Sequence, residues 1–312
     1  MIAIASTKGL PHEKWLAYRR MGIGGSDASV ICGVNKYKSP VELWMEKTGQ
    51  QPDAEAGEAA HWGNMLEPLV RTEFSRQSGI EVIPVHQILQ SSEYPFMLAN
   101  LDGVCRHPEY GKCIFEAKTA SAYKSAEWEG AAVPYAYVLQ VQHYMAVTGY
   151  VGAFVAVLIG GNQFQWKYIE RDEGLIAMLI RMEQDFWERV QNGVPPNLDG
   201  SEASVAYINK RYPEGTASSI IRLPDAAADL ICQYKEACEQ LAQVTEQKQK
   251  ATNLLKQMLG ANETGTLGDN IITWKNVSQE RFDSKLFETE QPEIHERYMS
   301  KTTHRRFIVR AA

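Results

Sequence analysis

The sequence predicts a mixed α/β fold, in which helices flank a central sheet that contains both antiparallel and parallel strands. Strand-length apolar segments alternate with segments of helical periodicity along the first two thirds of the chain. The composition, 44% hydrophobic and 22% charged residues, is typical of an ordinary globular domain. No segment approaches about 18 consecutive apolar residues, so we expect no transmembrane helix and no membrane partner.

Helices are expected before residue 80. Ser26 follows a glycine turn and is the predicted N-cap of the second of them. The last of these helices, 57–78, has apolar residues at core-facing spacing, and Pro68 within it predicts a kink or a helix start near Glu67. These helices are placed at 11–20, after the turn 23–25, from Pro40 to Gly49 and at 57–78.

Three strands follow and are expected to form an antiparallel meander, with turns at Pro95 and at 108–111. A helix, two strands joined at a Gly-Gly turn and a long amphipathic helix come next. The meander strands are placed at 80–90, 96–105 and 112–118, and the later elements at 135–148, 151–159, 163–170 and 174–191.

The pattern changes near residue 200. We therefore predict a core domain over 1–200 and a C-terminal extension over 201–312. Within the extension, 201–222 is polar and mixed, and 224–259 predicts one long helix. A pair of strands is then expected, 265–276 with 303–310.

The net charge of −6 does not by itself indicate nucleic-acid binding, but the charge is unevenly distributed. Residues 1–40 carry six Lys or Arg against two acidic residues, and 297–312 carry five with no acid. Ordinary solvated charge or a positive channel would both explain this pattern. The five cysteines form no CxxC pair, which favours reduced packing residues over a zinc or iron–sulfur site.

The strongest chemical pattern is Leu101-Asp102-Gly103, followed by Glu116-Ala117-Lys118 thirteen residues after the glycine. Alternate side chains share a face of a strand, so Glu116 and Lys118 project together. If 96–105 pairs with 112–118, Asp102 lies beside them. Two carboxylates and a backbone carbonyl suit Mg²⁺, with Mn²⁺ able to substitute, and the ammonium would stabilise a phosphate. The alternative is a surface hairpin with a solvated Glu and Lys.

Two flanking residues strengthen the interpretation of this cluster as the active site of a nuclease. Glu67 precedes the meander and could supply a third carboxylate, or simply pair with Arg71 one turn further on. Gln140 and Tyr144 lie one turn apart on the helix after Lys118, whereas Gln142 must face another way. An uncharged glutamine near a phosphate site can position water, or it can be plain helix surface.

Six segments follow one another along the chain: GIGGSDAS, ELWMEKTG, GNMLEP, LDG, FEAK and LQVQHYM. In this order they resemble the YqaJ-like viral recombinase family, whose relatives include lambda exonuclease. The resemblance covers roughly residues 10–192.

The resemblance implies a restriction-endonuclease-like, PD-(D/E)xK fold and assigns roles residue by residue. Asp102, Glu116 and the Ala117 carbonyl would bind the metal, Lys118 would be the catalytic lysine, and Glu67 and Gln140 would assist. Arg20 and Ser26 would bind the 5′-phosphate of DNA, a suitable task for a guanidinium and a hydroxyl at a helix N-terminus. Arg19 is an equally close match to Arg20.

The resemblance also implies a Mg²⁺-dependent 5′-to-3′ exonuclease acting on double-stranded DNA ends. Such an enzyme often forms a homotrimeric ring and leaves single strands for a single-strand annealing protein. We expect it in the cytoplasm of a bacterial host. An endonuclease or end-processing nuclease of the same superfamily is the first alternative, and a catalytically silent DNA-end-binding protein is the second.

The basic C-terminal segment adds two candidates for DNA contacts. If 303–310 is a strand, Arg306 and Arg310 share one face, while Phe307 and Val309 share the other. The apolar side would then dock onto the body, and the basic side would face DNA or a neighbouring subunit.

Overall fold

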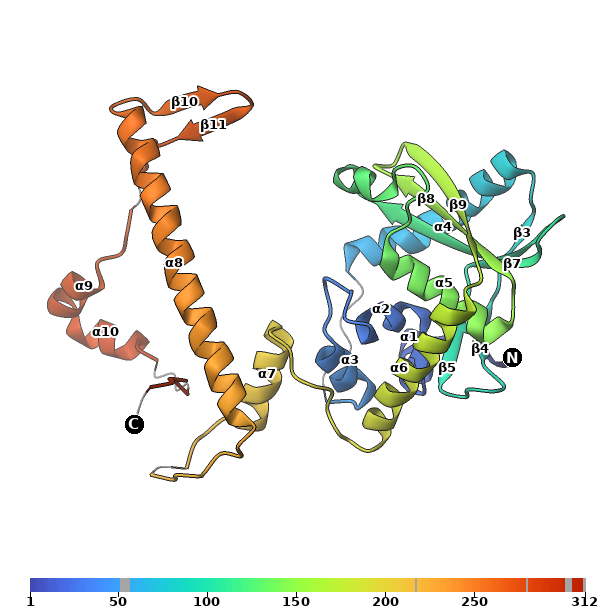
Figure 1. Ribbon diagram of the computed structural model, residues 1–312, viewed down its shortest axis with the longest axis horizontal. Coiled ribbons are helices and arrows are strands. Elements are labelled where there is room, and N and C mark those ends of the chain that lie inside the picture. The colour runs from blue at the N-terminus through green and yellow to red at the C-terminus, as the bar shows by residue number, and fades with distance from the viewer. Residues whose placement is uncertain (51–56, 217, 279, 301–304, 311–312) are drawn as a thin grey trace. The chain divides into compact units, whose positions relative to one another are not determined.

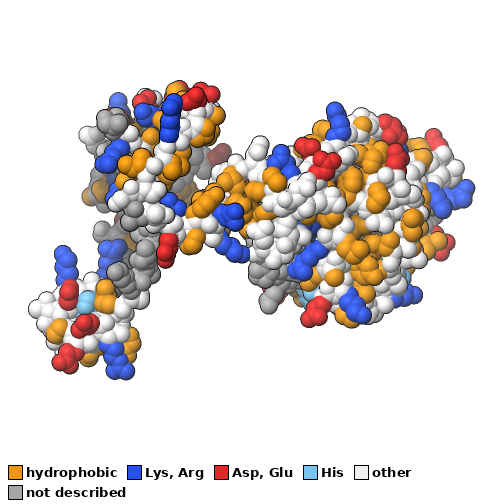
Figure 2. Space-filling model, turned by 90° about the horizontal axis from the view of Figure 1, so that it is seen from below, with side chains coloured by type: hydrophobic (Ala, Val, Ile, Leu, Met, Phe, Trp, Pro, Cys, Tyr) orange, Lys and Arg blue, Asp and Glu red, His pale blue; other side chains and the backbone are white. Residues whose placement is uncertain are grey.

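The computed structural model describes residues 1–312 except 51–56, 217, 279, 301–304 and 311–312. The chain divides into two compact units, residues 1–211 and 212–312. The first unit therefore extends past residue 200, because it includes helix α7 (Glu202–Arg211). On the face shown in Figure 2, acidic, basic and hydrophobic side chains are interspersed.

A five-stranded sheet forms the centre of the first unit, in the order β3-β6-β7-β8-β9 (Figure 1). Neighbouring strands are antiparallel except β7 and β8, which are parallel and connected through helix α5 (Tyr135–Thr148). The predicted mixed α/β fold is thus confirmed. The strands span Val82–Ile83, Gly103–His107, Gly111–Ala120, Gly152–Ile159 and Gln163–Glu170.

A second sheet of four strands has the order β1-β4-β5-β2. It contains β1, an N-terminal strand that the sequence pattern did not predict, and only β2 and β5 are parallel in it. Its strands span Ile2–Ser6, Gln87–Gln90, Met97–Asn100 and Ile23–Gly24.

The predicted three-strand meander is wrong in its first two members. The segment 80–90 splits at Pro84 into β3 and β4, and 96–105 splits after Asn100 into β5 and β6. In both cases the two halves belong to different sheets, so the chain passes twice between them. Proline has no N–H for a ladder, which explains the first break. The predicted pairing of the second strand with the third is confirmed, because Gly103 lies opposite Phe115 and Cys105 opposite Cys113.

Helices α4 (Glu58–Ser78) and α5 cover opposite faces of the five-stranded sheet. Alternation along β7 sends Phe115 into the cluster that contains Phe74 of α4, and Ile114 into the cluster that contains Val141 of α5. Pro68 lies inside α4, so the alternative of a helix start near Glu67 is wrong. The α5 face of β7 is the one that also carries Glu116.

The remaining helices of the first unit agree with the sequence except at one cap and at two elements that were not predicted, η1 and α7. The N-cap of α2 is Gly24 and not Ser26, because the Asp27 carboxylate accepts a hydrogen bond from the Gly24 N–H at 3.0 Å. Helix α7 lies in the segment 201–222, for which the polar and mixed sequence predicted no element, and its Tyr207 packs edge-on against Trp44. The other bounds are α1 His12–Arg20, α2 Gly25–Ile31, α3 Pro40–Lys47, η1 Ala122–Trp128 and α6 Glu173–Gln191.

The second unit is built on α8 (Ala227–Leu259), a helix of 33 residues. The predicted pairing of 265–276 with 303–310 is wrong, because β10 (Thr264–Leu267) pairs with β11 (Asn270–Thr273) in a tight hairpin. Gly268, at a φ of 57°, permits this turn. Residues 305–310 form no strand, and 303–304 lie outside the described residues. Helices α9 (Ser284–Glu290) and α10 (Pro292–Tyr298) complete the unit.

Within the part of the chain that the structure describes, no helix is both long enough and apolar enough to cross a membrane.

Candidate active site

Two carboxylates lie side by side where β6 begins against β7. Asp102 immediately precedes β6, and its Oδ2 accepts a hydrogen bond of 2.8 Å from the backbone N–H of Ala117. The carboxylate thereby continues the ladder along β7 one step beyond Gly103, the first residue of β6. Glu116, only 2% exposed, projects from the same stretch of β7 toward α5. The chain reversal between β6 and β7 therefore brings together the two acids that lie fourteen residues apart in the sequence.

Lys118 and Gln140 hold the Glu116 carboxylate from two directions. The Lys118 ammonium lies 2.7 Å from Glu116 Oε1, as expected for alternate residues of one strand. The Gln140 side-chain amide donates to the same oxygen at 2.6 Å, and its carbonyl accepts from Lys118 Nζ at 3.0 Å. Tyr137 of α5 lies under the ammonium, with Nζ 4.7 Å from the ring centroid. The three polar groups form a closed triangle of hydrogen bonds.

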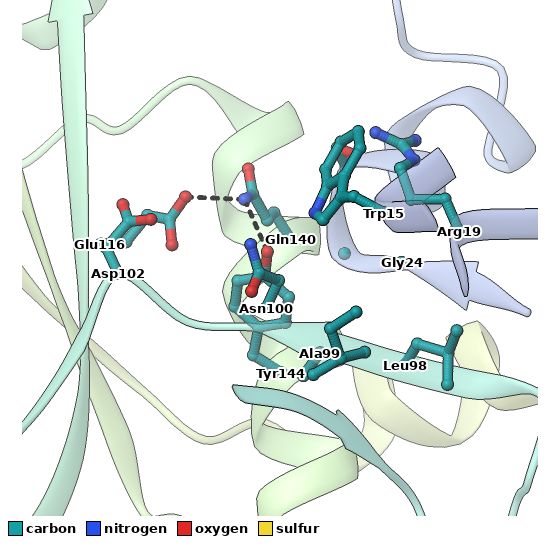
Figure 3. A pocket seen from close by; sticks show the side chains of 13 residues that line it. Trp15, Arg19, Gly24, Leu98, Ala99, Asn100, Asp102, Glu116, Gln140 and Tyr144 are labelled. Atoms are coloured by element: carbon teal, nitrogen blue, oxygen red, sulfur yellow. Dashed lines mark hydrogen bonds between the residues drawn. The ribbon is translucent and has the colours of Figure 1, made fainter. Parts of the chain in front are cut away.

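The two glutamines of α5 have separate tasks. Gln140 faces Glu116 and also contacts the Tyr144 hydroxyl at 3.2 Å, one helical turn away (Figure 3). Gln142 instead donates to the Glu170 carbonyl at 2.6 Å and accepts from the Asp172 N–H at 3.0 Å. The prediction that the two glutamines face different ways is confirmed.

Burial makes the charged forms of these acids costly. Desolvation, together with the nearby Asp102, raises the pKa of Glu116 to about 7. Desolvation also raises the pKa of Asp102 to about 6, opposed by the charge of Lys118. Burial disfavours the Lys118 ammonium, but Glu116 and Asp102 outweigh it and raise the lysine pKa. Burial therefore favours the neutral forms of both carboxyl groups unless further positive charge approaches them.

The donor set fits a divalent cation. Glu116 Oε2 is buried and has no hydrogen-bond partner among the described residues. A buried carboxylate oxygen in that condition is costly unless something positive approaches it. No group of three or more His, Cys, Asp or Glu side chains in the described ranges is arranged to hold a metal. Mg²⁺ does not require one, since it keeps several waters and commonly uses one or two carboxylates.

Glu67 lies at the edge of this cluster. Together with Asp102, Glu116, Ala117 and Lys118 it lines a cavity of ≈ 250 Å³. Its Oε1 accepts a 2.9 Å hydrogen bond from Arg71, so the expected pair one turn apart on α4 is present. Arg71 also donates to the Asp102 carbonyl at 3.2 Å. Glu67 is thus tied to the site through Arg71, and burial raises its pKa.

A second cavity, of ≈ 160 Å³, adjoins the first and shares Asp102 and Glu116 with it (Figure 3). Arg19 and Trp15 of α1 and Ser26 of α2 line it, as do Gln140 and Tyr144. The Arg19 guanidinium lies 5.2 Å from the Trp15 ring centroid, over its face. Arg20 is half-buried and is not among the residues that line this cavity.

A buried ion pair beside this cavity was not predicted from the sequence. Asp27 of α2 contacts Lys47 of α3 at 2.7 Å and Arg19 at 2.8 Å. Lys47 also donates to the carbonyls of Arg19 and Gly22, each at 2.7 Å. Although burial opposes it, the charges of Lys47 and Arg19 hold the pKa of Asp27 far below its usual range. This network fixes both the guanidinium and the backbone of Arg19.

Gly25 is required where α2 meets α5. A Cβ at this position would lie 2.5 Å from Tyr144 Cε1 and 3.0 Å from Gln140 Cγ, closer than side chains approach. The glycine of the GIGGSDAS segment therefore lets Ser26 come up to the Gln140 end of the carboxylate cluster.

The Arg306 and Arg310 side chains, the last two predicted contacts, are exposed in the second unit. Their expected placement on one face of a strand is wrong, because 305–310 is not extended into a sheet.

The fold and the site define a mixed α/β protein with an acidic, lysine-containing cluster at the centre of its sheet. Residues 14–151 match the model of the YqaJ-like viral recombinase domain. The chain is 42% identical over 311 residues to the uncharacterized protein YqaJ of Bacillus subtilis (strain 168), covering 98% of this chain and 97% of that one. The chain belongs to the YqaJ family.

Two solved structures are also similar. One is an alkaline exonuclease (LHK-Exo) from Laribacter hongkongensis, with a TM-score of 0.49, 19% identity and coverage of 64% of this chain and 97% of that one. The other is a phage related exonuclease from Haemophilus somnus 129PT, with a TM-score of 0.43, 13% identity and coverage of 57% and 99%.

Proposed function

We propose that this chain is a Mg²⁺-dependent exonuclease that digests one strand of double-stranded DNA from its 5′ end. The observation that carries the proposal is the cluster of Asp102, Glu116, Lys118 and Gln140, held together by hydrogen bonds of 2.6–3.0 Å. Such a set of carboxylates with an adjacent ammonium suits phosphodiester hydrolysis. Membership of the YqaJ family, described as viral recombinase-like, supports DNA as the substrate.

Asp102, Glu116 and the Ala117 carbonyl would hold the metal. When bound, the ion polarises the phosphate and lowers the pKa of water. Lys118 is placed to stabilise negative charge as it develops on the phosphate oxygens. Gln140 orients Lys118 and Glu116 through the bonds at 3.0 and 2.6 Å. Glu67 would act through water at the edge of the site.

The second cavity would receive the 5′-phosphate of the strand being digested. Arg19 offers a guanidinium that Asp27 already orients, and Ser26 adds an exposed hydroxyl near the start of α2. Because the two cavities share Asp102 and Glu116, a phosphate bound in one lies close to the bond broken in the other. This adjacency favours removal of short products from an end over cleavage within a duplex.

The biological role that fits this chemistry is resection in phage-type recombination. The enzyme would leave 3′ single strands for a single-strand annealing protein. A homotrimeric ring around the duplex would keep it on one substrate molecule.

The decisive assay uses purified protein on blunt duplexes labelled at either end, with 5′-phosphate or 5′-hydroxyl termini, with Mg²⁺ or EDTA. We expect Mg²⁺-dependent loss of label from the 5′ end first, faster on phosphorylated ends. Cleavage of closed circular DNA would indicate an endonuclease instead. Binding to ends without cleavage in either Mg²⁺ or Mn²⁺ would indicate a silent end-binding protein.

A further inference from the structure

Helix α8 carries an apolar stripe with the seven-residue repeat of a coiled coil. Apolar side chains recur at alternating spacings of four and three residues along the helix, with one lysine among them. This 3.5-residue period keeps one line of side chains facing a partner helix. The nine residues, named the α8 stripe, are Leu230, Tyr234, Ala237, Leu241, Val244, Lys248, Ala251, Leu255 and Met258.

The large side chains of the α8 stripe are exposed. Leu230, Leu241 and Val244 are 66%, 68% and 60% exposed, and Met258 is 80% exposed. Tyr234, at 43%, receives an edge-on contact from Phe307, with ring centroids 5.7 Å apart. A continuous line of exposed apolar side chains along a helix of about 50 Å marks an interaction surface.

The distribution of charge permits this surface to pair with a copy of itself. Apart from Lys248, the charged residues of α8 lie on the side away from the stripe. The positions that flank the stripe are uncharged, so two identical helices would meet without repulsion along their margins. The flanking residues are Ile231, Gln233, Cys238, Gln240, Thr245, Gln247, Thr252, Leu254 and Leu259.

A coiled coil of this length needs a partner helix of similar length. Among the described helices, α4 and α6 come next, with 21 and 19 residues. The core-facing side of α6 is buried around Leu179, and that of α4 around Phe74. The exposed apolar residues of α4, Trp62, Met65 and Leu69, span only about two turns. Among the described helices, α8 alone has the length of the stripe, so a second copy of α8 is the partner of matching length.

We propose that the α8 stripe binds the α8 stripe of a second copy of this chain, as an antiparallel two-stranded coiled coil. In the register that aligns the two helices end to end, each stripe alanine meets Tyr234 or Lys248, and the aliphatic residues meet one another. Leu241 lies against the partner's Val244, Tyr234 against the partner's Ala251, and Lys248 against the partner's Ala237. A parallel arrangement would instead place Lys248 against Lys248 and alanine against alanine, leaving gaps.

Lys248 has a specific role in this arrangement. Beside the partner's Ala237 its ammonium does not meet a second ammonium, whereas a parallel register would bring the two lysines together. A single lysine in an otherwise apolar stripe fixes register and orientation at a cost in stability. The resulting contact is isologous, so it joins chains in pairs around a two-fold axis.

Disulfide trapping in the full chain tests both pairing and orientation. In a Cys232→Ser/Cys238→Ser background, we would prepare Leu230→Cys and Leu255→Cys as separate proteins, mix them reduced and then oxidise them. The antiparallel coil predicts covalent dimers in the mixture and little from either protein alone. Covalent dimers from each protein alone would overturn the antiparallel arrangement, and none in the mixture would overturn the pairing.

Sedimentation provides the second measurement. Leu241→Glu/Val244→Glu should reduce the mass of the assembly about twofold, whatever number of first units associate on their own. Ala242→Glu/Gln249→Glu, on the opposite side of the same helix, is the matched control and should leave the mass unchanged. An unchanged mass for the stripe variant would show that another part of the same chain covers the stripe and would overturn the proposal.

Discussion

Asp27 and Lys47 form an ion pair whose charged atoms are 2.7 Å apart and whose side chains are each 3% exposed. Helices α2 and α3 meet at this pair, and Arg19 of α1 joins it. Removing one partner leaves an uncompensated buried charge. We therefore expect Asp27→Ala to lower the free energy of unfolding by about 3–5 kcal/mol. Chemical denaturation measures this change. The control is Glu73→Ala, which breaks an exposed pair with Arg76 and should leave the free energy of unfolding close to that of wild type.

The ion pair of Asp27 and Lys47 also predicts how the stability of the protein depends on pH. The pKa of Asp27 is depressed in the folded protein, so its contribution is present above the unfolded value near 3.8 and declines as the pH falls below it. The difference in stability between wild type and Asp27→Ala should thus be constant from pH 5 to 7 and shrink below about pH 4. A difference that grows in acid would contradict the assignment of Asp27 as the ionised partner.

The ionisation of Glu116 should give the opposite pH dependence of stability in the metal-free protein. Its folded pKa is raised to about 7, so stability is greatest below the unfolded value of 4.5 and is lost as the pH rises through 7. We expect Glu116→Gln, which cannot ionise, to become increasingly more stable than wild type between pH 5 and 8 in EDTA. Adding Mn²⁺ at pH 8 should stabilise wild type and not the variant. The comparison of two proteins cancels the titration of groups that do not interact with Glu116, such as His143.

Loss of either metal carboxylate should abolish cleavage. Glu116→Ala and Asp102→Ala should each slow hydrolysis by about three orders of magnitude or more, since metal activation supplies several kcal/mol of barrier lowering. Lys118→Ala should be similarly slow yet still bind Mn²⁺ in calorimetry. Glu109→Ala, an exposed acid in the β6–β7 turn, is the control. Near-wild-type rates for Glu116→Ala or Asp102→Ala would contradict the assignment of this cluster as the active site.

Substrates with 5′-phosphate and 5′-hydroxyl ends distinguish the role of Arg19 from that of Arg20. Since Arg19 lines the second cavity, Arg19→Ala should slow digestion of 5′-phosphorylated ends about 10- to 100-fold more than that of 5′-hydroxyl ends, the range expected when a charge-assisted hydrogen bond is removed. Arg20→Ala should affect the two substrates equally. If only Arg20→Ala changes the ratio, the phosphate site is misplaced; if Arg19→Ala slows both substrates alike, Arg19 is a general backbone contact.

Arg306 and Arg310 stay predicted DNA contacts. The double variant Arg306→Ala/Arg310→Ala should weaken duplex binding and reduce the log–log salt dependence by about 0.9 for each phosphate that is no longer bound. Cleavage of a short saturating substrate should persist. Lys235→Ala/Lys250→Ala, which removes two exposed charges of α8, controls for net charge. Dissociation of an oligomer with an unchanged salt slope would make the segment an interface.

The sequence predicts most readily those features that depend on local periodicity. The bounds of α5 and the common face of Glu116 and Lys118 both follow from repeats of 3.6 and 2 residues. The two chain passages between sheets, at Pro84 and after Asn100, were missed because each half-strand is too short to show its own partner. The pair of Asp27 and Lys47 was missed because nothing local links residues on different helices. The same holds for Tyr137, which reaches Lys118 from α5.

The position of β7 inside its sheet has a consequence for hydrogen exchange. Glu116, Ala117 and Lys118 are paired with Val155, Ala156 and Val157 of β8, and the Ala117 N–H is held by Asp102 on the other side. Exposing these amides to solvent requires separating the central strands of the first unit, and not the fraying of a loop. Their exchange should therefore be among the slowest in the protein and should track global unfolding. On the proposed function, the strand that carries Glu116 and Lys118 would therefore stay a rigid reference while DNA binds.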